Sequence, residues 1–263
     1  MVLFHQIMTR GIIFYDDEYA EECQEFCLLR NISYLPHIID KHTCYYFDKK
    51  KKLFTKKPIQ ADQIVEAEES IFQRKFAEIF EEFDVLFVQD KEVLCGVVHF
   101  SDYNRPAVHD HLYQQLYLLE RALVFLVVKY GGKTKRQLFE FFNKAEDERT
   151  DELLTEKDFR GHKISLKHIL EFVAHYDLLK MKKEDIKRVI EIRNAIAHSD
   201  DLVTQTNQHA KSYHHNSFVK LLRGVDSMEV ALRQLSNRLY LLRAIEEDDF
   251  TMPPMPLEDY LFK

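Results

Sequence analysis

The stretch that decides the fold of the C-terminal half is residues 184–200, EDIKRVIEIRNAIAHSD. On a helix with 3.6 residues per turn, its apolar side chains gather on one face, and Arg193 falls near the middle of that face. The polar residues after His198 predict that the helix ends there. We therefore expect an amphipathic helix over residues 184–198, with an apolar face made of Ile186, Val189, Ile190, Ile196 and Ala197.

Arg193 needs an anion if it lies on this face. A guanidinium keeps its charge in proteins, and burying it without a partner is costly. The partner could be internal, because Glu120 lies midway along an earlier predicted helix. It could also be external, because a guanidinium can bind two oxygens of a phosphate at once. The sequence leaves both partners open.

Asn194 and His198 lie four residues apart, so they are neighbours on a helix. A neutral imidazole at His198 can take a proton from a ribose 2′-hydroxyl or protonate a leaving 5′-oxygen. Arg193 can stabilise the charge that develops on the phosphorus centre, and Asn194 can orient the phosphate or the imidazole. These roles suffice to cleave RNA without a metal, because RNA supplies its own nucleophile.

The spacing of these residues alone favours a simpler interpretation. In it, Arg193 is bridged to Glu120, and His198 stabilises a helix C-terminus. Moreover, Arg193 and His198 point about 140° apart on an ideal helix. A shared site would require a distorted helix end or a second copy of the chain.

The surrounding residues 109–245 are expected to be almost wholly helical. A long first helix carries a single apolar stripe and stops at Gly131-Gly132. A tail, residues 246–263, follows the last helix. The stripe consists of Leu112, Leu116, Leu119, Leu123 and Leu126, and later helices are predicted at 135–143, 165–176, 184–198 and 217–245.

In this setting, Arg193-Asn194-x-x-x-His198 resembles the Arg-x(4–6)-His signature of HEPN domains (higher eukaryotes and prokaryotes nucleotide-binding). The likeness covers residues 109–245: a long first helix, further helices, the motif late in the domain and a final helix. It implies a metal-independent endoribonuclease that acts as a dimer, with Arg193, Asn194 and His198 as catalytic residues and Glu120 in support. The family also contains inactive members that only bind.

Residues 1–108 combine short strands with helices, which indicates an α+β unit made of two weak copies of a β-α-β-β pattern. A basic turn is expected at residues 49–52. The predicted strands cover 11–15, 32–40, 43–47, 84–88 and 93–99, and the predicted helices cover 18–31 and 64–83.

Two segments of this half resemble CBS (cystathionine-β-synthase-type) modules. Residues 96–102, Gly-Val-Val-His-Phe-Ser-Asp, are similar to the family ending Gly-φ-φ-Thr/Ser-x-x-Asp, where φ is apolar. Residues 31–40 are similar to the inner strand, Ile-x-x-Leu-Pro-Val-Val-Asp. The resemblance implies a degenerate first copy over 10–57 and a second copy over 58–108, which together bind an adenosine nucleotide.

The resemblance also implies roles for residues of the second copy. Asp102 would accept hydrogen bonds from both ribose hydroxyls, and Ser101 and Arg105 would reach the phosphates. His99 stands at the family's Thr/Ser position, and the first copy lacks the ribose motif. We therefore expect one nucleotide site, with AMP, ADP or ATP as a regulatory ligand. A purely structural dimerisation module is the alternative.

Composition limits the classes of function. The net charge of −7 excludes a protein that coats nucleic acid electrostatically, so RNA must contact a local patch. No apolar run is long enough for a membrane span, and the N-terminus lacks the features of a signal peptide. The four cysteines, in a chain of this length, indicate buried thiols in a reduced, cytoplasmic protein. We expect no metal and no cofactor for catalysis.

Other polar clusters are weaker candidates. The cations around Gly131-Gly132 could contact an RNA backbone, or they could be solvated at a helix end. The histidines of the polar segment 199–216 could bind metal or substrate, although a polar loop is the default. These residues are Lys129, Lys133, Lys135, Arg136, His209, His214 and His215.

The sequence as a whole predicts an α+β CBS-like pair followed by an all-α HEPN-like bundle. The predicted function is a nucleotide-regulated endoribonuclease that cuts single-stranded RNA as a homodimer. The alternative is a non-catalytic adenine-nucleotide sensor or scaffold, in which the Arg193 and His198 motif is structural.

Overall fold

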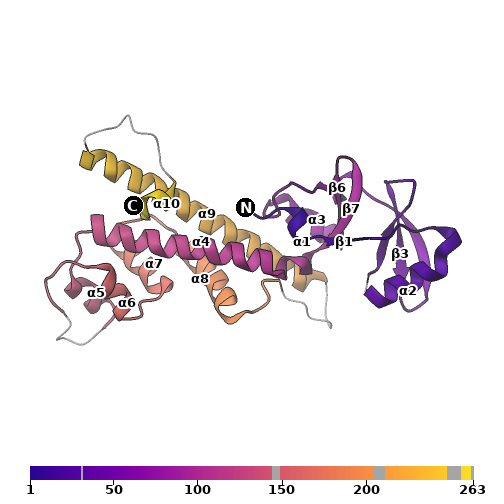
Figure 1. Ribbon diagram of the computed structural model, residues 1–263. Helices are drawn as coiled ribbons and strands as arrows, with labels where there is room; N and C mark the ends of the chain where they lie inside the picture. Colours follow the sequence, from indigo (N-terminus) through magenta and orange to yellow (C-terminus); the bar gives the residue numbers. More distant parts are fainter. Residues whose placement is uncertain (31, 144–148, 204–210, 248–255, 262–263) are drawn as a thin grey trace. The chain divides into compact units, whose positions relative to one another are not determined.

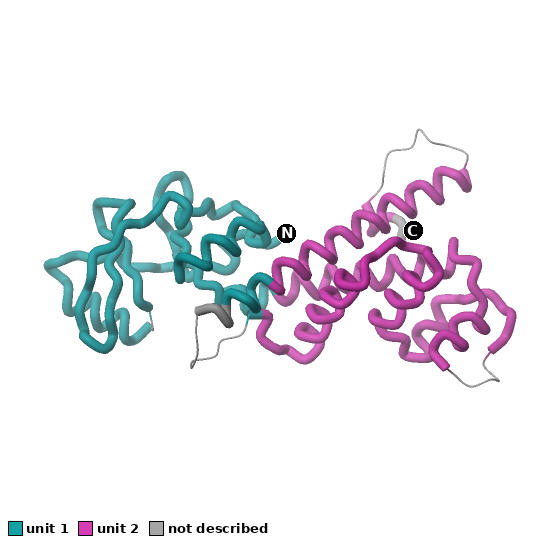
Figure 2. The backbone as a smooth tube through the Cα atoms, turned by 180° about the vertical axis from the view of Figure 1, so that it is seen from behind, with its two compact units in different colours: residues 1–108, 203–219 teal, residues 109–202, 220–263 magenta. Residues whose placement is uncertain are grey.

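The computed structural model describes residues 1–30, 32–143, 149–203, 211–247 and 256–261 (Figure 1). The chain forms two compact units, one of residues 1–108 and 203–219 and the other of residues 109–202 and 220–263 (Figure 2). The first unit mixes strands with helices and the second is helical, so the expected order of an α+β part and an all-α part is confirmed. Among the described helices, none is long and apolar enough to span a membrane.

Two sheets organise the first unit. The larger has the strand order β1-β7-β6-β5, and the smaller has the order β2-β3-β4. The strands are β1 (Thr9–Arg10), β2 (Tyr34–Pro36), β3 (Thr43–Asp48), β4 (Leu53–Pro58), β5 (Ile64–Glu66), β6 (Val85–Asp90) and β7 (Val93–His99). The helices are α1 (Phe4–Ile7), α2 (Ala20–Arg30) and α3 (Lys75–Glu82), with short 3₁₀ turns η1 (Asp17–Tyr19), η2 (Ala61–Gln63) and η3 (Phe100–Asn104).

The same order of elements occurs twice in this unit. In the second half, β5 is parallel to β6, α3 lies between them in the chain, and β7 returns antiparallel to β6. In the first half, Tyr15 forms a parallel bridge with His37, α2 lies between them, and β3 returns antiparallel to β2. A β-α-β-β pattern is therefore present in both halves, in a reduced form in the first.

The predicted hairpin of β6 and β7 is confirmed. Lys91 and Glu92, at its tip, have φ of 49° and 66°. Positive φ at both central residues is the conformation of the two-residue turn that matches the twist of antiparallel strands. The basic turn after β3 is also confirmed, because the Asp48 carboxylate accepts the backbone N–H groups of Lys50 and Lys51.

Three expectations for the first unit were wrong. The helix predicted over 64–83 is a strand at its start, Ile64–Glu66, because that segment pairs with β6, and only α3 is helical. The strand predicted at 11–15 lies instead at Thr9–Arg10, where it pairs with β7. The sequence also did not predict β4, whose side chains are mostly exposed and so show no apolar alternation.

Three of the four cysteines in this unit are buried among apolar side chains, and Cys95 is partly buried. Cys23 and Cys27 face Leu35 and Phe47 from α2, whereas Cys44 belongs to a separate cluster with Phe87. Burial raises the pKa of the Cys27 and Cys44 thiols to about 11. Thiols in this environment are protonated at neutral pH and act as small apolar groups.

The second unit is built from helices packed along α4. The predicted leucine stripe of α4 is confirmed, because all five of its members are buried. The helices are α4 (Pro106–Phe125), which continues as a π-helical turn η4 (Leu126–Tyr130), then α5 (Lys135–Phe141), α6 (Glu156–Gly161), α7 (Leu166–His175), α8 (Lys183–His198), α9 (Lys211–Glu247) and α10 (Leu257–Leu261).

Helix α8 has the predicted bounds within one residue, but its buried face differs from the prediction. Ile186, Val189 and Ile192 are buried, whereas Ala197 is exposed. The helix therefore packs along its first three turns, and its last turn leaves the core. Arg193 lies beside the buried stripe and is half-buried, rather than in the middle of the stripe.

Residues 203–219 belong to the first unit although the sequence assigns them to the helical half. The ring of Phe218, near the start of α9, lies 5.2 Å from the ring of Phe80 and 4.7 Å from that of Tyr103. The Asn104 side chain accepts the backbone N–H of Val203 and donates to its carbonyl. Residues 203–219 therefore pack against η3 and α3 and complete the core of the first unit.

Candidate functional site

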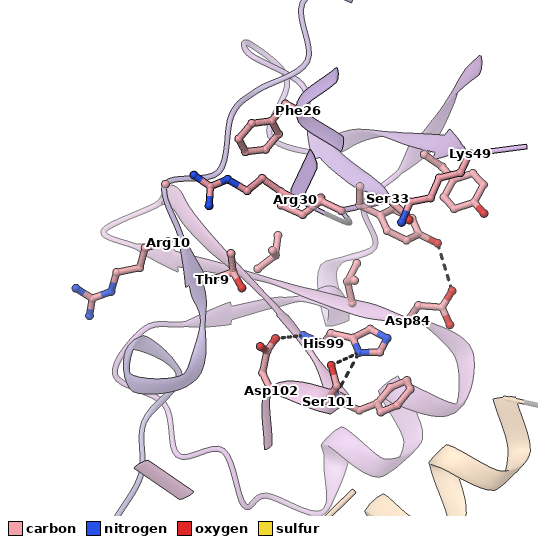
Figure 3. Close-up of a pocket in the computed structure, with 17 residues that line it drawn as sticks. Thr9, Arg10, Phe26, Arg30, Ser33, Lys49, Asp84, His99, Ser101 and Asp102 are labelled. Carbon is pink, nitrogen blue, oxygen red and sulfur yellow. Dashed lines mark hydrogen bonds between the residues drawn. The ribbon is translucent and has the colours of Figure 1, made fainter. Parts of the chain in front are cut away.

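The first unit contains a pocket of about 950 Å³ between its two sheets (Figure 3). One side is lined from the smaller sheet and α2, and the other from β6, β7 and the turn that follows β7. A pocket of this size lies at the upper end of the range of about 300–1,000 Å³ for small-molecule sites. His99, Ser101 and Asp102, three of the predicted nucleotide-binding residues, lie together in its wall.

Asp102 is held in place by two donors. Its Oδ2 accepts the backbone N–H of His99 at 2.8 Å, which caps the η3 turn. Its Oδ1 accepts the Nε–H of Arg105 at 2.9 Å. A carboxylate has about four lone-pair directions, so two bonds leave acceptor capacity for hydroxyl groups in the pocket.

His99 and Ser101 form a second fixed pair. The His99 Nδ1 accepts the backbone N–H of Ser101 at 3.2 Å and lies 2.8 Å from the Ser101 hydroxyl oxygen. Because Nδ1 accepts, the neutral ring carries its proton on Nε2. The pair therefore holds an imidazole ring and a hydroxyl group in fixed positions in the wall of the pocket.

Arg105 does not line this pocket. Its guanidinium donates to Asp102, to the Met8 carbonyl at 3.1 Å and to the Thr9 hydroxyl at 2.8 Å. Each of the three nitrogens of the guanidinium therefore donates to a group of the protein itself. It is a positioning residue that ties η3 to β1, rather than the phosphate ligand that the sequence predicted.

The structure adds cations that the sequence did not single out. Arg10, Arg30 and Lys49 all line the pocket. Figure 3 shows Arg30 and Lys49 on the side opposite His99, Ser101 and Asp102, with the Arg10 guanidinium turned away. No local motif marks Arg30 or Lys49 as a ligand-binding residue, because Arg30 is the last residue of a helix and Lys49 is the first residue of a basic turn. Only the packing of the two copies brings them to one cavity.

A tyrosine and a carboxylate line the far side of the pocket. The Tyr34 hydroxyl donates to Asp84 Oδ2 at 3.4 Å. Burial, and then the negative charge of Asp84, raise the pKa of Tyr34 above its ordinary value. The phenol is therefore a proton donor at any physiological pH, and it reduces the negative potential that Asp84 contributes to the pocket.

The Arg193, Asn194 and His198 motif lies at the end of α8 in the second unit. Arg193 is half-buried, and Asn194 and His198 are exposed. The Arg193 Nη1 donates to Asn194 Oδ1 at 3.2 Å. Ser199 follows in the left-handed conformation, with φ of 55°, and ends the helix. All three motif side chains can therefore be reached from solvent.

Glu120 approaches Arg193 but does not form an ion pair with it. In the part of the chain that the structure describes, the only hydrogen bond of the Arg193 guanidinium goes to Asn194. Desolvation raises the pKa of the Glu120 carboxyl, and the charges of Arg193 and Arg121 act against this rise. The two groups feel each other's charge, but the Arg193–Glu120 bridge of the simpler interpretation is not formed.

Arg193 and His198 are not brought together within one chain. They lie five residues apart on a regular helix, which separates their directions by about 140°. Asn194 is a neighbour of both, one residue from Arg193 and one turn from His198. A single copy therefore presents two half-sites on adjacent faces of the helix end.

The other sequence candidates have structural partners. Lys129 pairs with Glu246, Lys135 with Glu152 and Arg136 with Asp151, and Lys133 lies over the ring of Tyr176. His215 bonds to the Ala77 carbonyl at 2.7 Å in the first unit. His209 and the side chain of His214 lie outside the described residues. No group of metal-ligating side chains occurs among the residues that are described.

Comparison with models of known protein families, with curated proteins and with solved structures found no match. The resemblance to CBS and HEPN domains therefore rests on the motifs and on the geometry described above.

Proposed function

We propose that this protein is a nucleotide-regulated, metal-independent endoribonuclease that cleaves single-stranded RNA as a homodimer in the cytoplasm. The observation that carries the catalytic half is that Arg193 is accessible and is not bridged to Glu120. An unbridged, half-buried guanidinium beside an exposed amide and imidazole suits an external phosphate. The sensor half is supported by the pocket that gathers His99, Ser101 and Asp102.

Catalysis assigns one role to each motif residue. His198 takes the proton of the 2′-hydroxyl, whose oxygen attacks the adjacent phosphorus, and a protonated imidazole returns a proton to the leaving 5′-oxygen. Arg193 stabilises the added negative charge on the phosphoryl oxygens. Asn194, which contacts Arg193, orients the phosphate between Arg193 and His198.

The divergence of Arg193 and His198 on α8 argues for a second copy of the chain. A second α8, related by a two-fold axis, supplies the group that points away in the first. The homodimer of the proposal is therefore a requirement of the active site.

The nucleotide acts through η3. Asp102 accepts the ribose hydroxyls, and η3 ends at Asn104, only two residues before α4 begins at Pro106. A ligand that shifts η3 therefore acts on the first residues of the helix that carries Glu120. No flexible linker separates the two parts of the chain at this point.

The second candidate function is a non-catalytic nucleotide sensor or scaffold. One observation favours it, namely the electrostatic coupling between Glu120 and Arg193. A modest side-chain rearrangement would close this pair and remove Arg193 from the surface. In that case the pocket would be the functional site of the protein, and the α8 motif would be structural.

The test is cleavage of a fluorescently labelled single-stranded RNA by purified protein in EDTA, with and without ATP or AMP. We expect cleavage by the wild type and its loss in His198→Ala, with Lys187→Ala, an exposed residue of the same helix, as the matched control. Equal cleavage by wild type and His198→Ala would sink the ribonuclease proposal. Calorimetry of nucleotide binding to Asp102→Ala tests the sensor half separately, and unchanged affinity would count against the ribose contact.

A further inference from the structure

The pocket of the first unit holds more positive charge than a nucleoside or its monophosphate needs. Arg30 and Lys49 line it from two different elements, against the carboxylates of Asp84 and Asp102, whereas Arg10 lines it with its guanidinium turned away. Both carboxylates are already engaged, Asp102 by Arg105 and Asp84 by the Tyr34 hydroxyl. The lining of the pocket therefore offers cations to the anionic part of a ligand as well as acceptors to its hydroxyl groups.

The cations and the expected ribose site occupy opposite sides of the cavity. Arg30 and Lys49 lie on the side formed by α2 and the turn after β3, opposite the side that carries Ser101 and Asp102, with the Arg30 guanidinium and the Lys49 amine at opposite ends of that side (Figure 3). A ligand that bonds to Asp102 with its ribose must extend across the cavity to reach them. The volume of about 950 Å³ leaves room for such an extended ligand.

We propose that this pocket selects nucleoside di- and triphosphates over monophosphates, with Arg30 and Lys49 binding the terminal phosphates. The inference rests on the nucleotide binding proposed above and specifies its ligand class. Arg30 supplies a planar fork that bonds two phosphate oxygens, and Lys49 supplies a mobile point charge. Because Arg30 and Lys49 come from the first β-α-β-β copy and Asp102 from the second, a polyphosphate contacts both copies at once. A monophosphate contacts mainly the second.

Arg10 provides a matched control. It has the same charge as Arg30 and lines the same cavity, but its guanidinium points away and donates to the His5 carbonyl at 2.9 Å. Arg10→Gln removes one positive charge from the neighbourhood without removing a group that faces the ligand. The Arg10→Gln variant therefore distinguishes the loss of a direct phosphate contact from the loss of one positive charge near the pocket.

The experiment is calorimetric titration of the full-length protein with ATP, ADP, AMP and adenosine, and with inorganic tripolyphosphate. We expect affinity to fall in the order ATP, ADP, AMP, adenosine. Arg30→Gln and Lys49→Gln should each weaken ATP binding about tenfold to a hundredfold and leave AMP binding within about threefold. Arg10→Gln should leave both within about threefold, and circular dichroism should show that each variant is folded.

The outcomes separate this inference from the function on which it rests. Equal affinity for all four adenosine ligands would overturn polyphosphate selection and leave nucleotide binding standing. A preference for ATP that survives both Arg30→Gln and Lys49→Gln would overturn the assigned residues. An equal loss of ATP and AMP binding in these variants would also overturn the assignment of Arg30 and Lys49 to the terminal phosphates. Absence of binding by every adenosine ligand would overturn the inference and the sensor proposal together.

Discussion

Arg105 holds Asp102 by two nitrogens of one guanidinium, with Nε 2.9 Å and Nη2 2.7 Å from the same carboxylate oxygen. The same side chain reaches Met8 and Thr9, so one residue connects β1, the end of α1 and the η3 turn. The ribose-binding carboxylate of the proposed nucleotide site is therefore fixed before any ligand arrives.

Replacing Arg105 should destabilise the protein and weaken nucleotide binding together. Arg105→Ala removes several hydrogen bonds from a partly buried position, so we expect a loss of about 1–3 kcal/mol in the free energy of unfolding. Urea denaturation followed by circular dichroism measures it. Arg10→Ala, which loses one exposed hydrogen bond, should cost less than about 1 kcal/mol. Equal effects of the two variants would show that Arg105 has no special positioning role.

The catalytic proposal predicts a non-additive pattern at α8. Arg193→Ala and His198→Ala should each reduce the rate of RNA cleavage by about 10²–10³, and the double variant should be little slower than either one. Arg193→Lys should recover only part of the rate, because an ammonium cannot bind two oxygens in one plane. Single-turnover rates on a labelled RNA give these values. Retention of the full rate in Arg193→Ala would remove this residue from the mechanism.

A mixed-dimer experiment tests whether two chains share one active site. If Arg193 of one copy works with His198 of the other, inactive Arg193→Ala and His198→Ala proteins should regain activity when mixed. About a quarter of the wild-type rate is expected after free exchange of equal amounts, because about half of the dimers are mixed and each mixed dimer keeps one of its two Arg193–His198 pairs. No recovery after verified subunit exchange would place the whole site within one chain.

Glu120 should make stability depend on pH. Its pKa is raised in the folded protein, so the folded state binds its proton more tightly than the unfolded state does. Stability is therefore lost as pH rises through the ordinary value near 4.5 and up to the folded-state value. Glu120→Gln removes this loss, so its Tm should exceed that of the wild type at pH 7 and match it below about pH 4.

The control for Glu120 is Glu229→Gln, which changes an exposed carboxyl on α9. Its Tm should follow that of the wild type across the same pH range. A Glu120→Gln variant that is less stable than the wild type at pH 7 would show that Glu120 and Arg193 form a stabilising pair in solution. That result would favour the scaffold function over the ribonuclease.

Thiol reactivity should distinguish Cys95 from the other cysteines. Burial raises the pKa of Cys27 and Cys44 to about 11, and Cys23 is also buried. Burial raises the pKa of Cys95 as well, but Cys95 is only partly buried. At pH 8, a disulfide reagent should therefore modify Cys95 first, and the other three thiols only after unfolding. The fast phase should disappear in Cys95→Ser. Four fast thiols would mean that the clusters around α2 and β3 are open.

Much of the fold could be predicted because its signals are local. The stripe of α4, the bounds of α8 and the hairpin of β6 and β7 follow from periodicity and turn residues. The segment at 64–66 could not be assigned in this way, because three apolar and acidic residues fit either a helix or a strand, and pairing with β6 decides between them. Exposed β4 carries no alternation at all.

The residues of the candidate site also fall into those that a local motif reveals and those that only tertiary packing brings together. His99, Ser101 and Asp102 were found because they are adjacent in sequence and match a motif. Arg30 and Lys49 join them only through tertiary packing, which spacing does not report. Arg105 was given the wrong role because a sequence shows its charge but not Met8 and Thr9, to which that charge is already bonded.

The chain passes between the two units three times: after residue 108 within α4, after residue 202, and after residue 219 within α9. A fragment that ends at residue 108 would keep every strand and lose Phe218, against which Phe80 and Tyr103 pack. The first unit therefore cannot be exchanged between proteins as an N-terminal cassette. A transplant has to carry residues 203–219 as a second segment, so any recombination that preserves this protein's core must join the two units at three points rather than one.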